Sequence, residues 1–411
     1  MKIDIKFLGG CGEVGRSAIL VDDLLLDYGM KPSDPPQFPL NGIRPKSVIV
    51  SHAHIDHCGI VPNLVDLNPD MVMTPPTRDI SYFLGKDTIK IGKSQGILPF
   101  IEEDLKRFFE MARTLPYNEE FRTAGYDVKL YDAGHIPGSS CIYLEGEKRL
   151  FYTGDINTSD TRLLNKADLD FPETDILIIE STYFGHNHSN RRELEKLFIE
   201  SIVETLDSGG HAIIPCFAVG RTQEIVMILH AHGLTPYVDG MGGAVFDIFM
   251  SNPSFLKNEK GLEGAMDSAR FVKRKRRSDA ISNPSIVVTT AGMLNGGPVL
   301  YYLNKIYKDP NSKILLTGYQ VEDTNGRSAI ERNYVEVDGR ILTLRASVEQ
   351  YDFSAHADDT ALKSIVSRFC DKGVECVFTV HGDDTKGFAE WIRENCGCEA
   401  IAPENGDEVI F

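Results

Sequence analysis

A cluster of three histidines and one aspartate is the clearest indication of chemistry in this chain of 411 residues. His52, His54, Asp56 and His57 fall within six positions, directly after the apolar run Ser47–Val50. Imidazole nitrogens and carboxylate oxygens are ligands suited to Zn²⁺. A turn that follows a strand can aim alternate side chains at one point. Because the chain has 11 histidines in all, three so close together predict a metal site.

Three more candidate ligands stand at the ends of other strand-like runs. His135 follows the run Val128–Tyr131, Asp155 follows a run that ends at Tyr152, and His381 follows Val380. A single histidine or aspartate in such a place is commonly a turn residue or a helix cap. Their shared placement, beside glycines that let the backbone crowd a centre, predicts that they act together.

The length and composition predict a soluble protein with two domains. A chain of 411 residues with 42% hydrophobic residues is long enough for two cores. No apolar run approaches the about 18 residues that span a bilayer. The N-terminus alternates like a strand and shows no signal-peptide pattern, so we expect a cytoplasmic protein.

The cysteines and the net charge narrow the kind of site. The eight cysteines form no C-x-x-C pair, which argues against a thiolate zinc site and predicts buried thiols, Cys58 among them. The net charge of −17 argues against non-specific binding of nucleic acid, although a local site can oppose the global field.

The order of apolar runs predicts a split first domain with an α/β insertion. The first part reads as short strands with turns: Ile3–Phe7, Ala18–Val21, Leu24–Leu26, Ser47–Val50, Val128–Leu130, Cys141–Leu144, Leu150–Tyr152 and Ile176–Ile179. Helical patterns cover Asp79–Ile91 and Glu102–Thr114, and after Ala346 we expect loops and one strand, Val374–Val380.

Between these parts, short apolar runs alternate with helices, as in a parallel sheet that is covered on both faces. The expected helices are Arg192–Leu206, Arg221–His230 and Pro298–Tyr307, and the expected strands are Ala212–Pro215, Pro236–Asp239, Ser285–Thr289 and Lys313–Thr317. We therefore predict one domain from residues 1–185 and 347–411, and an inserted domain at 186–346.

These motifs resemble a known family. His52-x-His54-x-Asp56-His57, with His135 and Asp155, matches the signature of the metallo-β-lactamase hydrolases, and Asp27 resembles their first motif. The β-CASP nucleases within that superfamily have three further motifs, which Glu180, His356 and His381 resemble. Inside the insertion, Pro215–Glu224 and Thr317–Glu322 extend the likeness. It is closest to the archaeal relatives of the eukaryotic pre-mRNA 3′-end cleavage endonuclease, and next to ribonuclease J.

The resemblance implies an αββα sandwich with an inserted, Rossmann-like β-CASP domain over a two-zinc site. It implies that His52, His54 and His135 bind one zinc, that Asp56, His57 and His381 bind the other, and that Asp155 bridges them. Asp27 would orient ligands from behind. Asp56 would also orient the attacking hydroxide, and His356, held and charged by Glu180, would protonate the leaving oxygen.

We expect the substrate to be RNA, and a few basic residues are candidates to contact it. Arg221 and Arg327 follow glycines in loops and are candidates for phosphate contacts, although most such arginines are surface ion-pair partners. Lys273 and Arg274 open the basic run 273–277, which could line an RNA groove or be a solvated face. The expected RNA is single-stranded, no membrane is involved, and a homodimer is possible.

Several other functions compete with this interpretation. A small-molecule hydrolase would not need so large an insertion, and a silent scaffold would have lost ligands. In the family that the motifs resemble, a histidine at the position of His381 is typical of enzymes that cut RNA, and a valine there is typical of enzymes that cut DNA. A 5′-3′ exoribonuclease of the ribonuclease J type has a small-residue loop where this chain has Tyr319 and Val321, which favours endonucleolytic cutting in RNA 3′-end processing or decay. The C-terminal stretch 396–411 is expected to be an edge strand or an interface.

Overall fold

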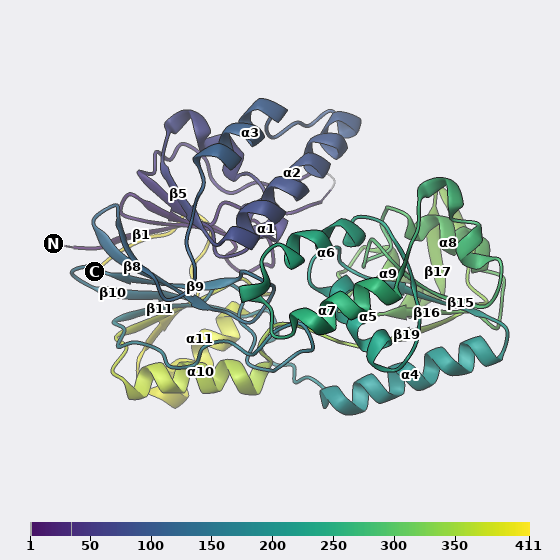
Figure 1. The fold of residues 1–411 in the computed structure, drawn as a ribbon. Helices are drawn as coiled ribbons and strands as arrows, with labels where there is room; N and C mark the ends of the chain where they lie inside the picture. Colours follow the sequence, from purple (N-terminus) through teal and green to yellow (C-terminus); the bar gives the residue numbers. More distant parts are fainter. Residues whose placement is uncertain (1, 34) are drawn as a thin grey trace. The chain divides into compact units, whose positions relative to one another are not determined.

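The computed structural model describes residues 2–33 and 35–411, and its contacts divide the chain into two compact units. Unit 1 takes the residues up to Asp160, 165–187 and 355–411, and unit 2 takes 161–164 and 188–354. Figure 1 shows the elements of both units with their labels. Within the described ranges, every helix is too short or too polar to traverse a bilayer.

Unit 1 contains two seven-stranded sheets. The first has the order β22-β1-β2-β3-β4-β5-β6, with β1 at Asp4–Gly9, β2 at Ala18–Val21, β3 at Leu24–Leu26, β4 at Ser47–Ile49, β5 at Asp70–Met73, β6 at Arg113–Thr114 and β22 at Glu408–Ile410. The second has the order β21-β20-β11-β10-β9-β8-β7, with β7 at Glu120–Thr123, β8 at Tyr126–Asp132, β9 at Ser140–Glu145, β10 at Arg149–Tyr152, β11 at Ile176–Glu180, β20 at Cys376–Val380 and β21 at Glu399–Ile401.

The two sheets pack face to face and helices cover their outer faces, which confirms the expected αββα sandwich. The inner faces meet in one apolar core, in which the rings of Phe7 and Phe378 lie 4.9 Å apart. Phe108 packs on the outside of the first sheet, and Phe369 packs on the outside of the second. In Figure 1 the helices stand as layers above and below the strands of this unit.

Local sequence signals set the limits of the helices in unit 1. The helices are α1 at Ile55–Cys58, α2 at Pro75–Gln95, α3 at Glu102–Met111, α10 at Asp359–Asp371 and α11 at Thr385–Cys396, with a 3-10 helix at Val61–Leu67. The Thr74 hydroxyl accepts a hydrogen bond from the backbone N–H of Thr77 at the start of α2, and Asp358 caps α10 in the same way. Gly397 ends α11 with φ of 68°, a conformation that favours glycine.

Unit 2 is built on a six-stranded parallel sheet of order β14-β13-β15-β12-β16-β19. Its strands are β12 at His211–Pro215, β13 at Tyr237–Asp239, β14 at Arg270–Phe271, β15 at Ser285–Thr289, β16 at Lys313–Leu316 and β19 at Ser347–Gln350, and β17 at Tyr334–Val337 pairs with β18 at Arg340–Thr343. Every residue of β15 is buried, because helices cover both faces of the sheet. The parallel α/β insertion expected from the sequence is therefore confirmed.

The helices of unit 2 alternate with these strands. They are α4 at Arg191–Asp207, α5 at Arg221–Ala231, α6 at Gly242–Met250, α7 at Glu259–Ser268, α8 at Val299–Ile306 and α9 at Asn325–Arg332, with 3-10 turns at Pro253–Phe255, Arg274–Arg276 and Asp279–Ile281. The short segment Thr161–Leu164 joins this unit because the buried Glu224 carboxylate accepts the backbone N–H groups of Arg162 and Leu163.

Three sequence expectations are wrong in detail. The chain after Ala346 is not mainly loop, because α10 and α11 lie on either side of β20. Thr114 is not helical, because it pairs with Met73 in β6. Cys370, Cys396 and Cys398 are half-buried rather than buried, while Cys58 is buried as expected. The C-terminal stretch is confirmed as edge strand, since β21 and β22 end the two sheets of unit 1.

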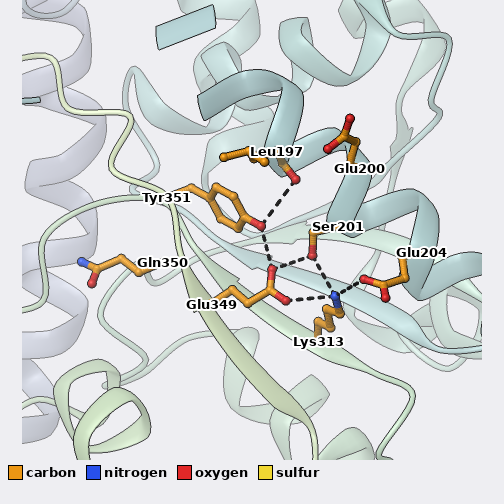
Figure 2. A pocket seen from close by; sticks show the side chains of 8 residues that line it. All are labelled: Leu197, Glu200, Ser201, Glu204, Lys313, Glu349, Gln350 and Tyr351. Carbon is orange, nitrogen blue, oxygen red and sulfur yellow. Dashed lines mark hydrogen bonds and ion pairs between the residues drawn. The ribbon is translucent and has the colours of Figure 1, made fainter. Parts of the chain in front are cut away.

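An open hollow of ≈ 690 Å³ in unit 2 is lined by an ion network. Figure 2 shows the Lys313 ammonium between the carboxylates of Glu204 and Glu349, at 2.7 and 2.9 Å. Although partial burial opposes its charge, hydrogen bonds to these two carboxylates raise the pKa of Lys313. Its charge is thus balanced by carboxylates of the protein itself.

Candidate metal centre

The predicted metal ligands converge at one rim of the unit 1 sandwich. His52 and His54 lie in the turn after β4, and Asp56 and His57 lie in α1 directly behind it. The remaining three follow strands of the second sheet: His135 comes after β8, Asp155 after β10 and His381 after β20. Strands β8, β10 and β20 run in the same direction, so their carboxyl ends meet at the same edge.

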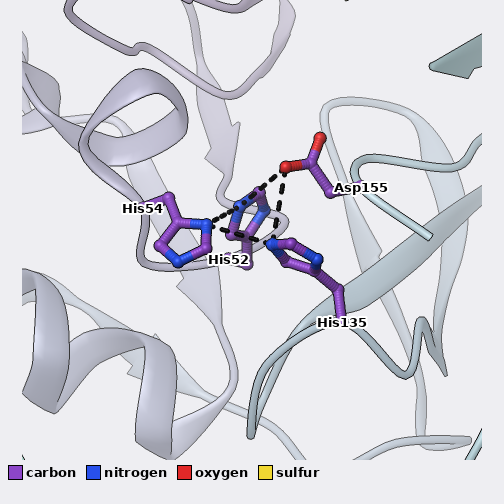
Figure 3. Close-up of side chains that lie close together, drawn as sticks. All are labelled: His52, His54, His135 and Asp155. Atoms are coloured by element: carbon purple, nitrogen blue, oxygen red, sulfur yellow. Dashed lines mark hydrogen bonds and ion pairs between the residues drawn. The ribbon is translucent and has the colours of Figure 1, made fainter. Parts of the chain in front are cut away.

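Four of these side chains form a first group with the spacing of a metal site. His54 Nδ1 lies 3.2 Å from His52 Nε2 and 3.0 Å from His135 Nε2. Asp155 Oδ2 lies 3.3 Å from His52 Nε2 and 3.6 Å from His135 Nε2, as Figure 3 shows. Tetrahedral ligands at the about 2.0–2.1 Å typical of zinc stand about 3.3 Å from one another. These four distances are close to the spacing that a zinc ion requires of its ligands.

A second group shares Asp155 with the first. Asp155 Oδ1 lies 3.2 Å from His57 Nε2 and 3.6 Å from His381 Nε2. Asp56 Oδ2 completes the group at 3.7 Å from His381 Nε2. The two oxygens of the Asp155 carboxylate therefore face different groups of imidazoles.

Orphaned polar atoms support the same conclusion. His57 Nε2 and Asp155 Oδ1 are buried and have no hydrogen-bond partner among the described residues. Each such atom costs about 1–3 kcal/mol when it is left unsatisfied. A divalent cation that accepts their lone pairs removes this cost, so the donor set fits zinc.

Hydrogen bonds on the outer side of the rings fix which nitrogen faces the centre. His57 Nδ1 donates to Asp27 Oδ2 at 2.7 Å, and His135 Nδ1 donates to the carbonyl oxygen of Ala355 at 2.6 Å. His381 Nδ1 lies 2.9 Å from the Ser17 hydroxyl. With Nδ1 protonated in this way, the Nε2 lone pairs point inward, as metal ligation requires.

Asp27 organises one side of the centre from a fully buried position. Besides His57, it accepts hydrogen bonds from the backbone N–H and the hydroxyl of Ser51, both at 2.7 Å, and from the hydroxyl of Tyr152 at 2.8 Å. Its backbone has φ of 59°, which is uncommon for residues other than glycine. Such strain persists only where surrounding contacts hold it in place.

Electrostatics keep several of these rings unprotonated. Burial, reinforced by the neighbouring His52, lowers the pKa of His54 to about 3. Burial and the adjacent His356 likewise lower the pKa of His135 well below its usual range. Although burial opposes its charge, His57 and His381 hold the pKa of Asp155 well below its usual range. At neutral pH His54 and His135 therefore present neutral imidazoles beside the Asp155 carboxylate, which are the forms that bind metal.

A histidine–glutamate pair adjoins the metal ligands. His356 Nδ1 lies 3.0 Å from both carboxylate oxygens of Glu180, and its Nε2 lies 4.0 Å from Asp155 Oδ2. Although burial opposes its charge, the carboxylates of Glu180 and Asp155 raise the pKa of His356 to about 9. The Glu180 carboxylate also accepts the backbone N–H of Ile156, which fixes its orientation. His356 therefore stands protonated beside the centre.

Two glycines allow the loops to close around the site. A Cβ on Gly29 would lie 1.7 Å from the carbonyl oxygen of Asp56, and a Cβ on Gly382 would lie 2.5 Å from the backbone of Ser181. His381 itself has φ of 49°. The close backbone approach that the glycine neighbours predicted is thus present at both ends of the centre.

The four predicted RNA contacts lie in unit 2, outside this cluster. Arg221 is half-buried at the start of α5, and Arg327 pairs with Glu331 at 2.6 Å within α9. Lys273 and Arg274 are exposed. Their role in binding RNA stays a prediction.

Sequence reasoning missed the residues that hold the ligands in place. Ser51, Tyr152 and Ser17 each bond a ligand or Asp27. Ser51 could have been noticed because it directly precedes His52, but Ser17 and Tyr152 carry no motif. The ring of Tyr183, three positions after Glu180, lies 5.9 Å from that of His356.

Family comparisons agree with this geometry. A model of the metallo-beta-lactamase superfamily matches residues 12–197, the Beta-Casp domain matches 222–328, and the Zn-dependent metallo-hydrolase RNA specificity domain matches 341–403. The chain belongs to the β-CASP branch of the metallo-β-lactamase superfamily. The family and fold expected from the sequence motifs are confirmed.

Curated relatives align along almost the whole chain. "RNase aCSPSF2" of Saccharolobus solfataricus is 35% identical over 100% of this chain and 85% of its own length. An "RNase J-like protein" of Methanocaldococcus jannaschii is 37% identical over 98% of each chain. "Transcription termination factor FttA" of Pyrococcus horikoshii is 34% identical over 99% of this chain and 71% of its own length. A solved structure of a protein of unknown function from Enterococcus faecalis, 13% identical, has the same fold over 100% of both chains with a TM-score of 0.63.

Replacing Asp27 by asparagine is expected to weaken zinc binding about 10-fold. Asparagine keeps the size of the side chain but loses the charge that holds the His57 N–H. Affinity is measured by competition with a chromophoric chelator, with circular dichroism as the check on folding. Asp23→Asn, on an exposed turn where Asp23 pairs with Lys46, is the control and should bind as the wild type does. Equal affinity of Asp27→Asn and wild type would show that Asp27 does not support the ligands.

Proposed function

We propose that this protein is a two-zinc ribonuclease that hydrolyses RNA phosphodiester bonds. The observation that carries the proposal is the Asp155 carboxylate, whose two oxygens each face a separate group of imidazoles. In the proposed arrangement, His52, His54 and His135 hold one ion, Asp56, His57 and His381 hold the other, and Asp155 belongs to both. The zinc dependence of the matched family models supports the choice of metal.

The bound metal ions supply an activated water and charge stabilisation for the phosphate. The protein contributes the rest. Asp56 is the one ligand of the second group that is not largely buried, and its carboxylate would also orient the attacking water. His356, kept protonated by Glu180, donates a proton to the leaving oxygen. Tyr183 limits the movement of the His356 ring from one side.

The names of the relatives support RNA as the substrate. Two of the three relatives above are named as RNase proteins and the third as a transcription termination factor. The third family model, matched at residues 341–403, is described as an RNA specificity domain and contains both His356 and His381. We therefore favour single-stranded RNA over DNA and over small molecules, and we expect the enzyme to act in the cytoplasm in RNA 3′-end processing, termination or decay.

The loop after β16 favours internal cleavage. The side chains of Tyr319 and Val321 are 48% and 40% exposed, so both project from a loop that needs small residues to receive a terminal 5′-phosphate. The alternative is 5′-3′ exonuclease activity, and the RNase J-like relative gives that alternative weight. The reaction products decide between them.

Metal analysis tests the two-zinc arrangement. The wild type should contain about two zinc ions per chain, and His54→Ala and His381→Ala should each contain about one, because each change empties one group. His230→Ala, which removes a histidine bonded to Ser268 in unit 2, is the control and should keep the full content. Unchanged zinc content in both test variants would refute the ligand assignment.

Product analysis tests the proposed reaction. An RNA labelled at its 5′ end, with triphosphate, monophosphate or hydroxyl termini, should yield internal fragments at similar rates from all three forms. Asp56→Ala and His356→Ala should reduce the rate at least about 100-fold, the usual size of a proton-transfer contribution. Mononucleotides released only from monophosphate ends would instead establish the exonuclease, and full activity of either variant would remove that residue from the reaction.

The pH profile tests the role of Glu180. The wild type should lose activity as pH rises through the pKa of His356, at about 9, because the proton donor is lost above it. Glu180→Gln removes the negative charge that raises this pKa but can still accept the N–H of Ile156. The alkaline limb of kcat should therefore move to lower pH, with the acid limb unchanged. An unmoved alkaline limb would show that His356 is not the group that titrates there.

A further inference from the structure

We propose that unit 2 holds single-stranded RNA on a surface of its own, the basic ridge, formed by Lys273, Arg274, Lys275 and Arg276 with the ring of Phe271. The inference rests on the ribonuclease function proposed above and adds to it a binding surface made of residues outside the metal centre. The chemistry recognised is the phosphate backbone together with an unstacked base.

The ridge follows β14, the edge strand of the unit 2 sheet. Strand β14 ends at Phe271, and the ridge follows directly from its carboxyl end. The neighbouring strand β13 runs parallel to β14 and ends at Asp239, which Arg277 contacts. The ridge is thus tied through Arg277 to the carboxyl end of the strand next to it.

The four cations of the ridge are not neutralised by the protein. All four are exposed, and none forms an ion pair with any residue that the structure describes. The chain carries 60 acidic against 43 basic residues, so carboxylate partners are abundant elsewhere. Four adjacent unpaired cations in an acidic protein create a local positive potential that attracts a polyanion.

The ridge is held rigidly at both ends. Before it, the backbone N–H of Val272 donates to the carbonyl oxygen of Val238 at 2.9 Å. After it, the Arg277 guanidinium reaches the buried Asp239 carboxylate at 2.6 and 3.3 Å, and the Tyr302 hydroxyl donates to the same carboxylate at 2.8 Å. The backbone N–H of Arg276 donates to the carbonyl oxygen of Lys273 at 2.7 Å and closes the turn. A fixed backbone lowers the entropy that binding would otherwise cost.

Phe271 gives the ridge an aromatic face. Its side chain is 43% exposed, and the edge-to-face contact with Phe246, at 5.8 Å between centroids, supports it from below. Gly243 also lies beneath the ring. An exposed aromatic ring beside a row of cations is the arrangement by which proteins hold single strands without reading their sequence.

RNA binding by the metal-free full chain tests the ridge without any need for cleavage. The affinity for a fluorescent oligouridine of about 20 nucleotides is measured by anisotropy in chelator over a range of salt concentrations. Replacing Lys273, Arg274, Lys275 and Arg276 by alanine should weaken binding at least about 10-fold. It should also reduce the slope of log affinity against log salt by up to about 3, because each lost phosphate contact on a single strand removes about 0.7.

The control variant removes the same charge elsewhere. Lys90, Lys106, Lys196 and Lys386 are exposed and each lies near a carboxylate, so their replacement by alanine changes the net charge equally. It should leave the salt slope close to that of the wild type. If the ridge variant and this control behave alike, the effect is one of net charge and the proposal is overturned. Binding of an acidic protein to the ridge that does not reduce RNA binding would also overturn the proposal, because it would show that RNA does not use these cations.

A conservative pair of changes tests the aromatic contact. Phe271→Leu keeps an apolar side chain against Phe246 but cannot stack on a base, whereas Phe271→Tyr keeps the ring. We expect about 10-fold weaker RNA binding for the leucine variant and wild-type binding for the tyrosine variant. Equal binding by both would exclude Phe271 from the surface.

The two proposals fail in distinguishable ways. If the wild type binds RNA with the expected salt slope but never cleaves it, the ribonuclease function fails and the ridge stands. If the wild type cleaves RNA and the ridge variant keeps both its KM and its salt slope, the ridge fails and the function stands. Hydrolysis of a small chromogenic phosphodiester should be the same in the ridge variant and the wild type, because such a substrate is too small to need the ridge.

Discussion

Asp155 is a buried carboxylate whose two oxygens face imidazole nitrogens, and the rest of the centre is arranged around it. Placing a carboxylate in an apolar interior costs several kcal/mol. The outer hydrogen bonds of His57 and His135 place their lone pairs inward, toward the oxygens of Asp155 rather than away from them. Burial lowers the pKa values of His54 and His135. Although burial opposes its charge, the carboxylates of Asp155 and Asp27 raise the pKa of His57 well above its usual range. A divalent metal bound here would accept the lone pairs of the inward-facing nitrogens and of the carboxylate.

The strands of the sandwich bring these groups together at one rim. Strands β8, β10, β11 and β20 end at the same rim, and each delivers one polar residue there: His135, Asp155, Glu180 and His381. The apolar contact between the sheets fixes the distance from these strands to β4 and the turn that carries His52 and His54. Each ligand thus depends on the core, although none belongs to it. The left-handed backbone of Asp27 and His381 shows that contacts around the metal, and not local preference, determine the conformation there.

The sequence predicted the parts of this structure that depend on local pattern. Strands and ligands followed from short apolar runs that end in histidine, aspartate and glycine, since both signals lie within a few residues. Helix α10 was missed because its apolar residues follow closely on the His356 motif, which drew the interpretation toward a loop. Thr114 was assigned to a helix because its pairing with Met73 lies some 40 positions away, beyond any local pattern.

The residues that hold the ligands could not be found in this way for the same reason. Ser17 lies 364 positions from His381, and Tyr152 lies 125 positions from Asp27, so only the folded chain reveals their hydrogen bonds. Conversely, the basic run at 273–277 was plain in the sequence, but the different roles of its five residues were not. Arg277 turns inward to Asp239 and anchors the segment, while the four preceding cations stay in solvent.

The exposure of these four cations bears on how an acidic protein can bind a polyanion such as RNA. A net charge of −17 repels RNA from most of the surface, so productive encounters depend on the few places where positive charge is concentrated. Cationic side chains on a protein surface commonly form ion pairs with neighbouring carboxylates, as Lys313 and Arg327 do here. Cations that have no such partner and stand on a fixed turn are the ones whose charge remains available to a substrate. Repulsion of RNA by the rest of the acidic surface then improves selectivity. An RNA strand that does not reach these cations gains no binding free energy from the other surfaces of the molecule.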